Sequence, residues 1–302
     1  MMDKKIYVIV VTYNGMKWIN KCFLSLKNSS IPLNIIAIDN ASTDESCDFI
    51  KENFETVNII QTGSNLGFSK ANNIGLKVAV EANADYIFLL NQDAWVEKHC
   101  IEKLVIYLEN DTTFSLLSPY HYNYEGTGSE FYFEQYVLKY YVKDYNCKFK
   151  DLQNSKALEA KFVHAAAWML PIKTVLEVGG FDPLFKHTGE DNDFIQRLQY
   201  KGLKAGILTS VNVCHQGTNA GLVDSEDNYV LHLNTILLKL KNPSASIGGA
   251  FWLFCLNTLR HIVSKNYKTK KFQKHIFVHV IRNVFKIIYS RNVQLKRNAY
   301  LN

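Results

Sequence analysis

Short apolar runs alternate with segments of helical periodicity through the first third of the chain. The first run, Ile6 to Tyr13, is rich in β-branched residues, which is typical of a fully buried parallel strand. Ser42, with Glu45 three positions later, predicts the N-terminal cap of one helix. This strand–helix alternation predicts an α/β fold with a mostly parallel, doubly wound sheet. The predicted strands are 6–13, 34–39, 57–62 and 86–90, and the predicted helices are 15–28, 42–53 and 69–83.

The pattern is less regular in the rest of the chain. After Gly217 it becomes helical, so we expect an α/β domain over residues 1–222 and a helical extension over 223–302. Residues 120–160 are aromatic and polar with weak periodicity, and we interpret them as a variable insert. The other predicted elements are helices over 96–108, 173–178, 191–201, 227–239, 249–264 and 271–290, and strands over 162–171 and 205–214.

Length and composition are those of a globular protein with a sizeable core. The chain has 302 residues, of which 47% are hydrophobic, enough for one large domain with an appendage. No run of eighteen apolar residues occurs, so we expect no transmembrane helix. Six scattered cysteines form no CxxC pair, which favours a reducing compartment, and we expect a cytoplasmic location. We interpret the first apolar run as a strand rather than a targeting peptide.

Charge is distributed unevenly along the chain. All 28 acidic residues lie at or before Asp227, whereas 13 of the 34 Lys and Arg residues follow it. The first 227 residues therefore carry 21 − 28 = −7, and the last 75 carry +13. A basic segment of this kind favours an anionic surface, either phospholipid or nucleic acid.

The basic segment also has an amphipathic pattern. Phe272, Ile276, Val280 and Val284 recur at helical spacing among many Lys and Arg residues. Interfacial helices combine such charge with aromatic side chains, so an anionic membrane on the inner face of the cell is one expected partner. The alternative is a helix that packs on the α/β domain and exposes a solvated basic face. The sequence leaves both interpretations open.

Four polar clusters follow the four predicted strands of the first half. They are Thr12 to Asn14, Asp39 to Asp44, Asn65 to Gly67, and Asn91 to Asp93. In open α/β sheets, ligands bind at the carboxyl ends of the strands. The convergence of four polar clusters on this edge is the main sequence signal for a binding site.

Two acidic motifs and one histidine are candidates for chemistry. Asp93 follows a buried strand, where a carboxylate could hold Mg²⁺ or Mn²⁺, or could cap the next helix. Glu190, Asp191 and Asp193 crowd the start of a helix, where one could act as a general base or all could simply suit the helix dipole. His215 ends a late strand as either a metal ligand or a core histidine.

Together these motifs resemble the family 2 glycosyltransferases of the GT-A fold, especially the bacterial rhamnosyltransferase-like branch. The resemblance extends from about Ile6 to about Gly217 and keeps the family's order. Any one motif is weak, but seven in order are specific. The motifs are Val10 to Asn14, Ile38 to Asp44, Asn65 to Phe68 with Asn72 and Asn73, Leu89 to Asp93, Gly179 to Asp182, Gly189 to Asp193, and His215.

The resemblance implies a role for each matching residue. Asp93 would hold the divalent cation, Mn²⁺ or Mg²⁺, that bridges the diphosphate, and His215 would be a further metal or diphosphate contact. Asn91 replaces the first acid of the family's DxD motif, which leaves one carboxylate fewer. Asp191, in the Glu190–Asp191 pair, would be the catalytic base. The implied nucleotide-binding residues are Thr12, Asn14, Asp39, Asn65, Gly67, Asn72 and Gln92.

The implied activity is a hexosyltransferase-type reaction with inversion. A sugar would pass from dTDP-rhamnose or a UDP-sugar to a hydroxyl of a glycan or lipid-linked acceptor during bacterial surface polysaccharide synthesis. The Gln-x-x-Arg-Trp motif of polymerising synthases is absent, because Gln196 is followed at once by Arg197, so transfer is expected to be non-processive. The aromatic residues of 131–145 would form either acceptor contacts or core packing.

Other classes fit the sequence less well. A nucleotide-dependent oxidoreductase should carry GxGxxG after the first strand, where this chain has Thr12-Tyr-Asn-Gly15. A nucleotidyltransferase should carry a Gly-rich loop with a basic residue there. A nucleic-acid-binding protein would not present 227 residues of net negative charge to a phosphate backbone. A catalytically inactive sugar-binding homologue is the remaining alternative, although a binding module has no need of a base.

Overall fold

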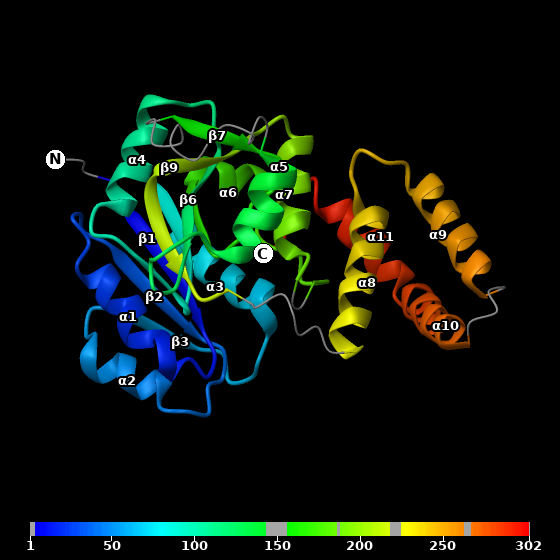
Figure 1. Cartoon of the computed structure of the whole chain (residues 1–302), viewed down its shortest axis with the longest axis horizontal. Helices are drawn as coiled ribbons and strands as arrows, with labels where there is room; N and C mark the ends of the chain where they lie inside the picture. The colour runs from blue at the N-terminus through cyan, green and yellow to red at the C-terminus, as the bar shows by residue number, and fades with distance from the viewer. Residues whose placement is uncertain (1–3, 143–155, 186–187, 218–224, 263–266, 302) are drawn as a thin grey trace.

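The computed structural model describes residues 4–142, 156–185, 188–217, 225–262 and 267–301. Within them a mixed sheet of nine strands is covered on both faces by helices, and a group of C-terminal helices lies at one end (Figure 1). The sheet order is β3-β2-β1-β4-β8-β6-β9-β5, with β7 also paired to β9. The strands are β1 Ile6–Thr12, β2 Asn34–Asp39, β3 Asn58–Gln61, β4 Tyr86–Asn91, β5 Ala94–Val96, β6 Leu116–Asn123, β7 Ala157–Ala160, β8 Ala167–Pro171 and β9 Ala205–His215.

The predicted parallel pairing is confirmed for the first half and for one later pair, because β6 is parallel to β9. Strands β1 to β4 are mutually parallel where they pair, as expected. By contrast, β8 is antiparallel to β4 and β6, and both β5 and β7 are antiparallel to β9. The sheet is therefore mixed rather than mostly parallel, with four parallel and four antiparallel strand pairs in the described part of the chain. Apolar content could not reveal the difference, because a strand covered on both faces reads as apolar in either orientation.

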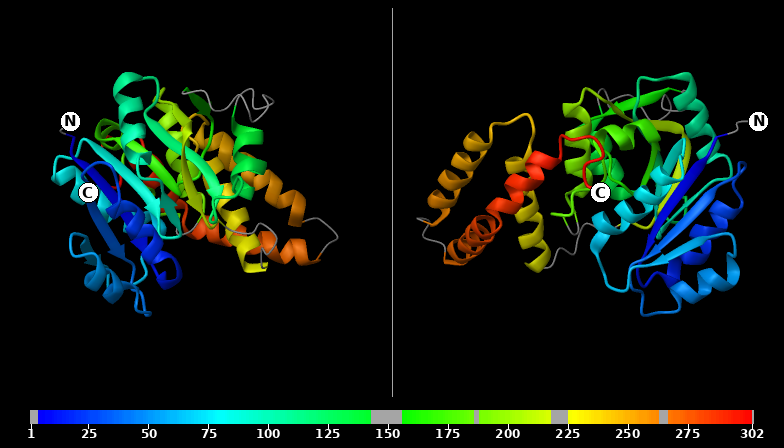
Figure 2. Two further views of the ribbon diagram at one scale, coloured as in Figure 1. Left: turned by 60° about the vertical axis from the view of Figure 1, so that its left-hand side comes forward. Right: turned by 180° about the vertical axis from the view of Figure 1, so that it is seen from behind.

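Alternate strand residues build two apolar layers. Val8 and Val10 of β1 face a core with α1, α2 and α4, whereas Ile9 faces a core with α3, α6 and α7. The views in Figure 2 show these two helical layers with the sheet between them. The helices of this domain are α1 Met16–Lys27, α2 Ser46–Asn53, α3 Gly67–Glu81, α4 Cys100–Asn110, the π-helix η1 Phe133–Leu138, α5 Lys139–Tyr141, α6 Ile172–Val178 and α7 Glu190–Tyr200.

Several predicted boundaries need correction. The predicted cap at Ser42 is wrong, because α2 begins at Ser46 and the Ser42 hydroxyl instead accepts a hydrogen bond from the Asn14 backbone at 3.1 Å. Residues 94–96 form β5 rather than the start of a helix. The predicted insert begins inside β6, a strand of the sheet interior whose first six residues are buried. Residues 143–155 of that insert lie outside the described part of the chain.

The C-terminal helices are α8 Ser225–Lys241, α9 Ile247–Ile262, α10 Tyr267–Arg282 and α11 Val284–Val293. The helix predicted over residues 271–290 is thus two helices, α10 and α11, which meet at Asn283. Ile276 and Val280, part of the predicted amphipathic stripe, are buried in a cluster with α8 and Phe185. The Phe272 side chain and the predicted domain boundary between residues 222 and 223 lie outside the part of the chain that the structure describes. None of the described helices is long and apolar enough to cross a membrane.

The end of the chain returns to the α/β domain (Figures 1 and 2). Asn298 donates a backbone hydrogen bond to Leu176, and Ala299 accepts one from Gly180 at 2.7 Å. Leu301 belongs to the core cluster that contains α3 and α6. Gly180 has no room for a side chain, since a Cβ there would lie 2.4 Å from Asn73 Oδ1. The basic segment is therefore anchored to the α/β domain at its C-terminal end.

Candidate active site

The first two parallel strands end in a pair of buried polar side chains. Thr12 and Asp39 are paired in register at the carboxyl ends of β1 and β2. The Thr12 hydroxyl lies 3.4 Å from Asp39 Oδ1, and both residues are almost fully buried. This places a carboxylate at the edge of the sheet where ligands bind in α/β folds. The sequence predicted this convergence.

Asn14 and Gln92 brace the loop after β1. Asn14 has φ 45° and accepts a hydrogen bond from the Thr43 backbone at 2.8 Å. The Gln92 amide exchanges two hydrogen bonds with the Tyr13 backbone, at 2.9 and 3.0 Å. A Cβ on Gly15 would lie 2.2 Å from Gln92 Oε1, so a side chain there would displace the Gln92 amide. Both predicted nucleotide-binding side chains thus hold the backbone that would form the pocket.

The loop before α3 is fixed by a pair of asparagines. Asn65 Oδ1 accepts hydrogen bonds from Asn40 at 3.1 Å and from the Gly67 backbone at 2.9 Å. Gly67 has φ +78°, which favours glycine at this turn. Asn72 is buried on α3 and donates to the Phe68 carbonyl at 3.0 Å. These predicted residues lie together around the start of α3.

The antiparallel pairing of β5 with β9 brings Asp93 to His215. The register pairs Ala94 with His215, and Asp93 Oδ1 lies 3.4 Å from His215 Nε2. Asn91, at the end of β4, has its amide nitrogen 3.5 Å from the same ring nitrogen. The alternative in which Asp93 caps a helix is wrong, because β5 follows it and α4 begins only at Cys100.

The donor set around Asp93 fits a divalent cation that shares its ligands with a diphosphate. The Asp93 side chain is 23% exposed, so one carboxylate faces a neighbouring imidazole and retains access to a ligand. Mg²⁺ and Mn²⁺ sites of this kind commonly use one or two carboxylates and complete their coordination with substrate phosphates and water. Asn91 supplies no charge, so much of the cation affinity would depend on the nucleotide.

Helix α7 begins with two carboxyl groups in different environments. Gly189 caps the helix with φ 91°. Burial raises the pKa of Asp191 to about 6, although hydrogen bonds from the backbone of Asn192 and Ala165 act to lower it. Burial, together with the nearby Asp191, raises the pKa of Glu190 to about 8. At neutral pH Asp191 is therefore ionised and able to accept a proton, whereas Glu190 is protonated.

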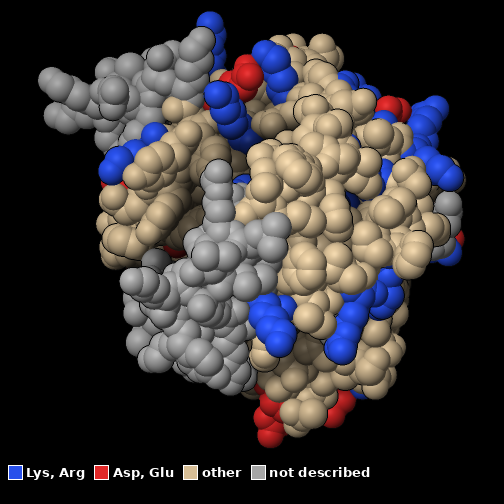
Figure 3. All heavy atoms as spheres, turned by 90° about the vertical axis from the view of Figure 1, so that its right-hand side faces the viewer, with Lys and Arg blue, Asp and Glu red and all other residues tan. Residues whose placement is uncertain are grey.

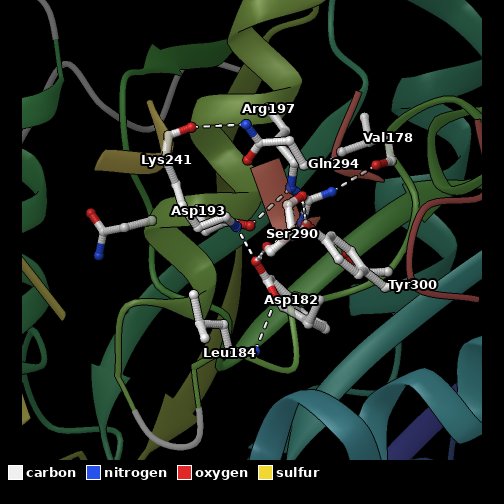
Figure 4. A network of polar contacts seen from close by, with 12 residues as sticks. Val178, Asp182, Leu184, Asp193, Arg197, Lys241, Ser290, Gln294 and Tyr300 are labelled. Atoms are coloured by element: carbon white, nitrogen blue, oxygen red, sulfur yellow. Dashed lines mark hydrogen bonds and ion pairs between the residues drawn. The ribbon is translucent and has the colours of Figure 1, made fainter. Parts of the chain in front are cut away.

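Asp193 has a structural role instead. It accepts hydrogen bonds from Arg197 Nε at 2.9 Å and from Lys241 Nζ at 2.6 Å, and all three side chains are buried. Burial would raise the pKa of Asp193, but Lys241 and Arg197 hold it below its usual range. Figure 4 shows Lys241, from α8, between Asp193 and Asp182. Of the acids at 190–193, Asp193 is therefore the one whose charge is balanced by buried cations.

The C-terminal helices support the start of α7. Asn234 of α8 donates to the Thr188 carbonyl at 2.8 Å, one residue before the glycine cap. Asp182 accepts hydrogen bonds from Ser290, which lies in α11, and from Tyr300, which lies near the C-terminus (Figure 4). Gln294 donates to the Lys241 carbonyl at 2.8 Å. Glu190 and Asp191 thus depend on the helical extension for their position.

Three residues near these groups were missed by the sequence interpretation. His121 of β6 and His164, before β8, lie beside His215, with ring centroids 4.4 to 6.1 Å apart. Tyr132 has its pKa raised to about 12, mainly by burial and then by the charge of Asp191. Isolated histidines and tyrosines in apolar segments carry no signal that identifies their partners in space.

The fold is that of the GT-A glycosyltransferases. The S. aureus protein TarS in complex with UDP-GlcNAc superposes with a TM-score of 0.57 over 97% of this chain and 84% of its own, at 15% identity. A mannosyltransferase from Pyrobaculum calidifontis, in complex with GDP-Man and Mn²⁺, gives a TM-score of 0.55 over 94% of this chain and 88% of its own, at 15% identity. Likenesses at this identity show the fold alone.

The comparison of sequences identifies the protein family. The profile of glycosyl transferase family 2 matches residues 7–177, more than half of the chain, and the protein belongs to this family. A dTDP-rhamnosyl transferase of Shigella flexneri, RfbF, is 32% identical over 111 residues, which are 36% of this chain and 36% of that protein. The chain therefore matches about a third of the length of this curated relative.

Proposed function

We propose that the protein transfers a sugar from a nucleoside diphosphate donor to an acceptor hydroxyl, with inversion at the anomeric carbon. The observation that carries this proposal is the pair Asp93 and His215, 3.4 Å apart, beside strand ends that carry Thr12 and Asp39. A nucleoside would lie against Asp39, and its diphosphate would extend to Asp93. Family membership supports the same arrangement.

The chain's own groups suit a single displacement. Asp191, ionised at neutral pH, would accept the proton of the acceptor hydroxyl as its oxygen bonds to C1. The bond between C1 and the diphosphate oxygen breaks in the same step, which inverts the configuration. Asp93, with His215 beside it, would hold a divalent cation, and such a cation stabilises the charge of a leaving diphosphate. Glu190, protonated at neutral pH, would remain a neutral neighbour of the base.

The donor we propose is dTDP-rhamnose, with UDP-sugars as the second choice. The Shigella relative is a dTDP-rhamnosyl transferase, while TarS was solved with UDP-GlcNAc. We propose non-processive transfer to a glycan or lipid-linked acceptor in surface polysaccharide synthesis. A catalytically inactive homologue is disfavoured because the raised pKa of Asp191 serves no purpose in binding alone.

We further propose that residues 223–302 form a C-terminal unit that contacts the anionic inner face of the cell membrane. Exposed large apolar side chains support this, notably Trp252 and Leu253 of α9 and Phe285 and Tyr289 of α11. Figure 3 views this end of the molecule, where Lys and Arg border a broad uncharged surface and acids lie only towards its margins. Apolar area combined with basic charge is the composition of an interfacial surface.

Thermal unfolding with a panel of nucleoside diphosphates tests the donor site. A ligand that binds only the folded state raises the unfolding temperature according to its occupancy. We expect dTDP or UDP to stabilise the protein more in the presence of Mn²⁺ than in its absence. Asp39→Asn should weaken the nucleotide effect, and Asp93→Asn should remove the part that depends on Mn²⁺. A protein that no nucleotide stabilises, with or without the cation, would contradict the proposal.

A further inference from the structure

Three neighbouring segments of the sheet bring three histidines together behind Asp93. His121 lies in β6, His164 just before β8 and His215 at the end of β9, and these strands are adjacent in the order β8-β6-β9. One nitrogen of each ring lies within 4.8 Å of one nitrogen of each of the others. His121 and His215 are buried, and the side chain of His164 is 13% exposed.

Each ring has a nitrogen that lacks a hydrogen-bond partner among the described residues. These buried atoms are Nδ1 of His121, Nδ1 of His215, and both nitrogens of His164. A buried polar atom without a partner is uncommon in proteins and often marks an ion or a water. Four such atoms on three neighbouring rings are therefore better explained by a shared ligand than by apolar packing.

The opposite nitrogens face oxygen atoms. His121 Nε2 lies 2.9 Å from Ser118 Oγ, and His215 Nε2 lies 3.4 Å from Asp93 Oδ1. His164 Nε2 lies 3.9 Å from Glu130 Oε2. Histidines that bind a metal usually donate their other ring N–H to such oxygens, which fixes the tautomer and the ring orientation. His121 has this contact, whereas His215 and His164 lie near a carboxylate at the longer distances of 3.4 and 3.9 Å.

We propose that His121, His164 and His215 form a binding site for a transition-metal ion such as Zn²⁺, distinct from the diphosphate cation at Asp93. Imidazole nitrogens suit Zn²⁺ and its neighbours, whereas Mg²⁺ prefers oxygen. Ligand nitrogens on a tetrahedral Zn²⁺ lie about 3.4 Å apart, so the nitrogens, within 4.8 Å of one another here, need to close by up to about 1.4 Å. Three protein ligands leave a fourth position for water.

Two further observations agree with this site. Burial, followed by the neighbouring histidines, lowers the pKa of His121 well below its usual value and that of His164 to about 3, so both rings are neutral and can bind a metal without losing a proton. Phe133 stacks on His121 with centroids 4.6 Å apart, which limits movement of that ring.

The site gives His215 a defined role in the proposed function. With Nδ1 on the inner ion, its Nε2 carries the proton and becomes a donor to Asp93 or to a diphosphate oxygen. His215 would then orient Asp93 rather than bind the outer cation itself. The inner site does not depend on the nucleotide, so it can be tested without a donor or an acceptor.

Metal titration of the full chain tests the proposal. Protein freed of metal with a chelator is titrated with Zn²⁺ against a chromophoric competitor, and with Co²⁺ by visible absorption, without nucleotide. We expect one ion per chain. His121→Gln and His164→Gln should each weaken binding by at least about 100-fold, and Ser118→Ala by about 10- to 100-fold. His99→Gln, which alters an exposed histidine at the N-cap of α4, is the matched control and should bind as the wild type does.

The outcomes separate this site from the proposed function. Asp93→Asn should keep the inner ion while it loses Mn²⁺-dependent stabilisation by nucleotide. A wild-type chain that binds no Zn²⁺, or binds it equally well after both histidine replacements, overturns the inner site and leaves the transferase proposal intact. If the variants do not fold, X-ray absorption of the Zn²⁺-loaded wild type decides. Three imidazole ligands support the site, and oxygen ligands alone overturn it.

Discussion

Lys241, in the C-terminal helix α8, donates a hydrogen bond of 2.6 Å to Asp193, three residues into the helix that carries the proposed catalytic base. Its ammonium group is fully buried and also pairs with Asp182. Lys241 contributes to the positive charge of the C-terminal segment, but its side chain forms buried ion pairs with two acids of the α/β domain. This ion pair joins the C-terminal helices to the start of α7.

Replacement of Lys241 should destabilise the protein strongly. Lys241→Met leaves Asp182 without its cation in a buried site, and breaking a buried pair by removing one partner typically costs about 3–5 kcal/mol. Lys239→Met changes an exposed lysine of the same helix and should have little effect. Urea denaturation of both variants measures the free energy of unfolding. Equal stability of the two variants would show that the buried pair is unimportant.

The pH dependence of transfer should reflect Asp191. Because its pKa is raised to about 6, the carboxylate becomes protonated and loses its function as a base as the pH falls through about 6. We expect kcat/KM to fall about tenfold for each pH unit below that value, while nucleotide binding changes little. Initial rates from about pH 5 to about pH 8, with nucleotide affinity at each pH, make the measurement. A rate that is constant across this range would exclude a base with a raised pKa.

Glu190 should make stability depend on pH in the opposite sense from an ordinary surface acid. Its folded-state pKa of about 8 lies above the usual value of 4.5, so the folded protein holds a proton that the unfolded chain releases. Stability is therefore lost as the pH rises between these values. Glu190→Gln cannot lose a proton at this position, so its free energy of unfolding should rise relative to that of the wild type as the pH rises. This difference should stop growing above about pH 8.

Denaturation of Glu190→Gln at about pH 5 and about pH 8 measures this effect. Glu81→Gln, an exposed acid at the end of α3, is the matched control and should show no such change over the range. A difference between Glu190→Gln and wild type that does not vary with pH would mean that Glu190 is not held protonated.

Membrane contact should depend on exposed aromatic side chains of the C-terminal helices. Phe285 is 84% exposed and Tyr289 is 70% exposed, and they lie four residues apart on one face of α11. Phe285→Ser with Tyr289→Ser should reduce binding to anionic liposomes several-fold in a sedimentation assay. The matched control is Phe131→Ser with Tyr140→Ser, an exposed pair in the α/β domain. Equal binding by both double variants would exclude this surface as the membrane contact.

Point substitutions are preferable to deletion of residues 265–302. Such a deletion would also remove Ser290 and Tyr300, which hydrogen-bond to Asp182, and Leu301, which lies in the core. A loss of liposome binding could then result from unfolding. The sequence alone gave no warning of this, because helical periodicity does not show what a helix packs against.

The parallel half of the fold was predictable because its signals are local. Each of β1 to β4 is a short apolar run followed by polar residues, so both the strands and the ligand-binding edge could be derived from the sequence. The antiparallel pairs were not predictable, since β5 has only three residues and pairs with a strand far along the chain. Asp93 and His215 were singled out by their positions after strands, and the family resemblance then chose between their alternative roles.

The contacts that relieve buried charge were the hardest to foresee. Asp193 was recognised only as one of several crowded acids, whereas its partner Lys241 was counted only among the 13 basic residues that follow Asp227. Likewise His121 and His164 stand singly in apolar segments, and only the order β8-β6-β9 places them beside His215. Pairings of this kind depend on tertiary structure and have no periodicity.

The most direct test of the account is transfer by the wild-type protein and by Asp191→Asn. Labelled dTDP-rhamnose and UDP-sugars are incubated with Mn²⁺ and a lipid-linked acceptor extract, and the anomeric configuration of the product is determined by NMR. We predict an inverted product from the wild type and a rate about 100- to 10,000-fold lower for Asp191→Asn, with nucleotide binding retained. A product with retained configuration, or undiminished transfer by Asp191→Asn, would contradict the mechanism proposed for this site.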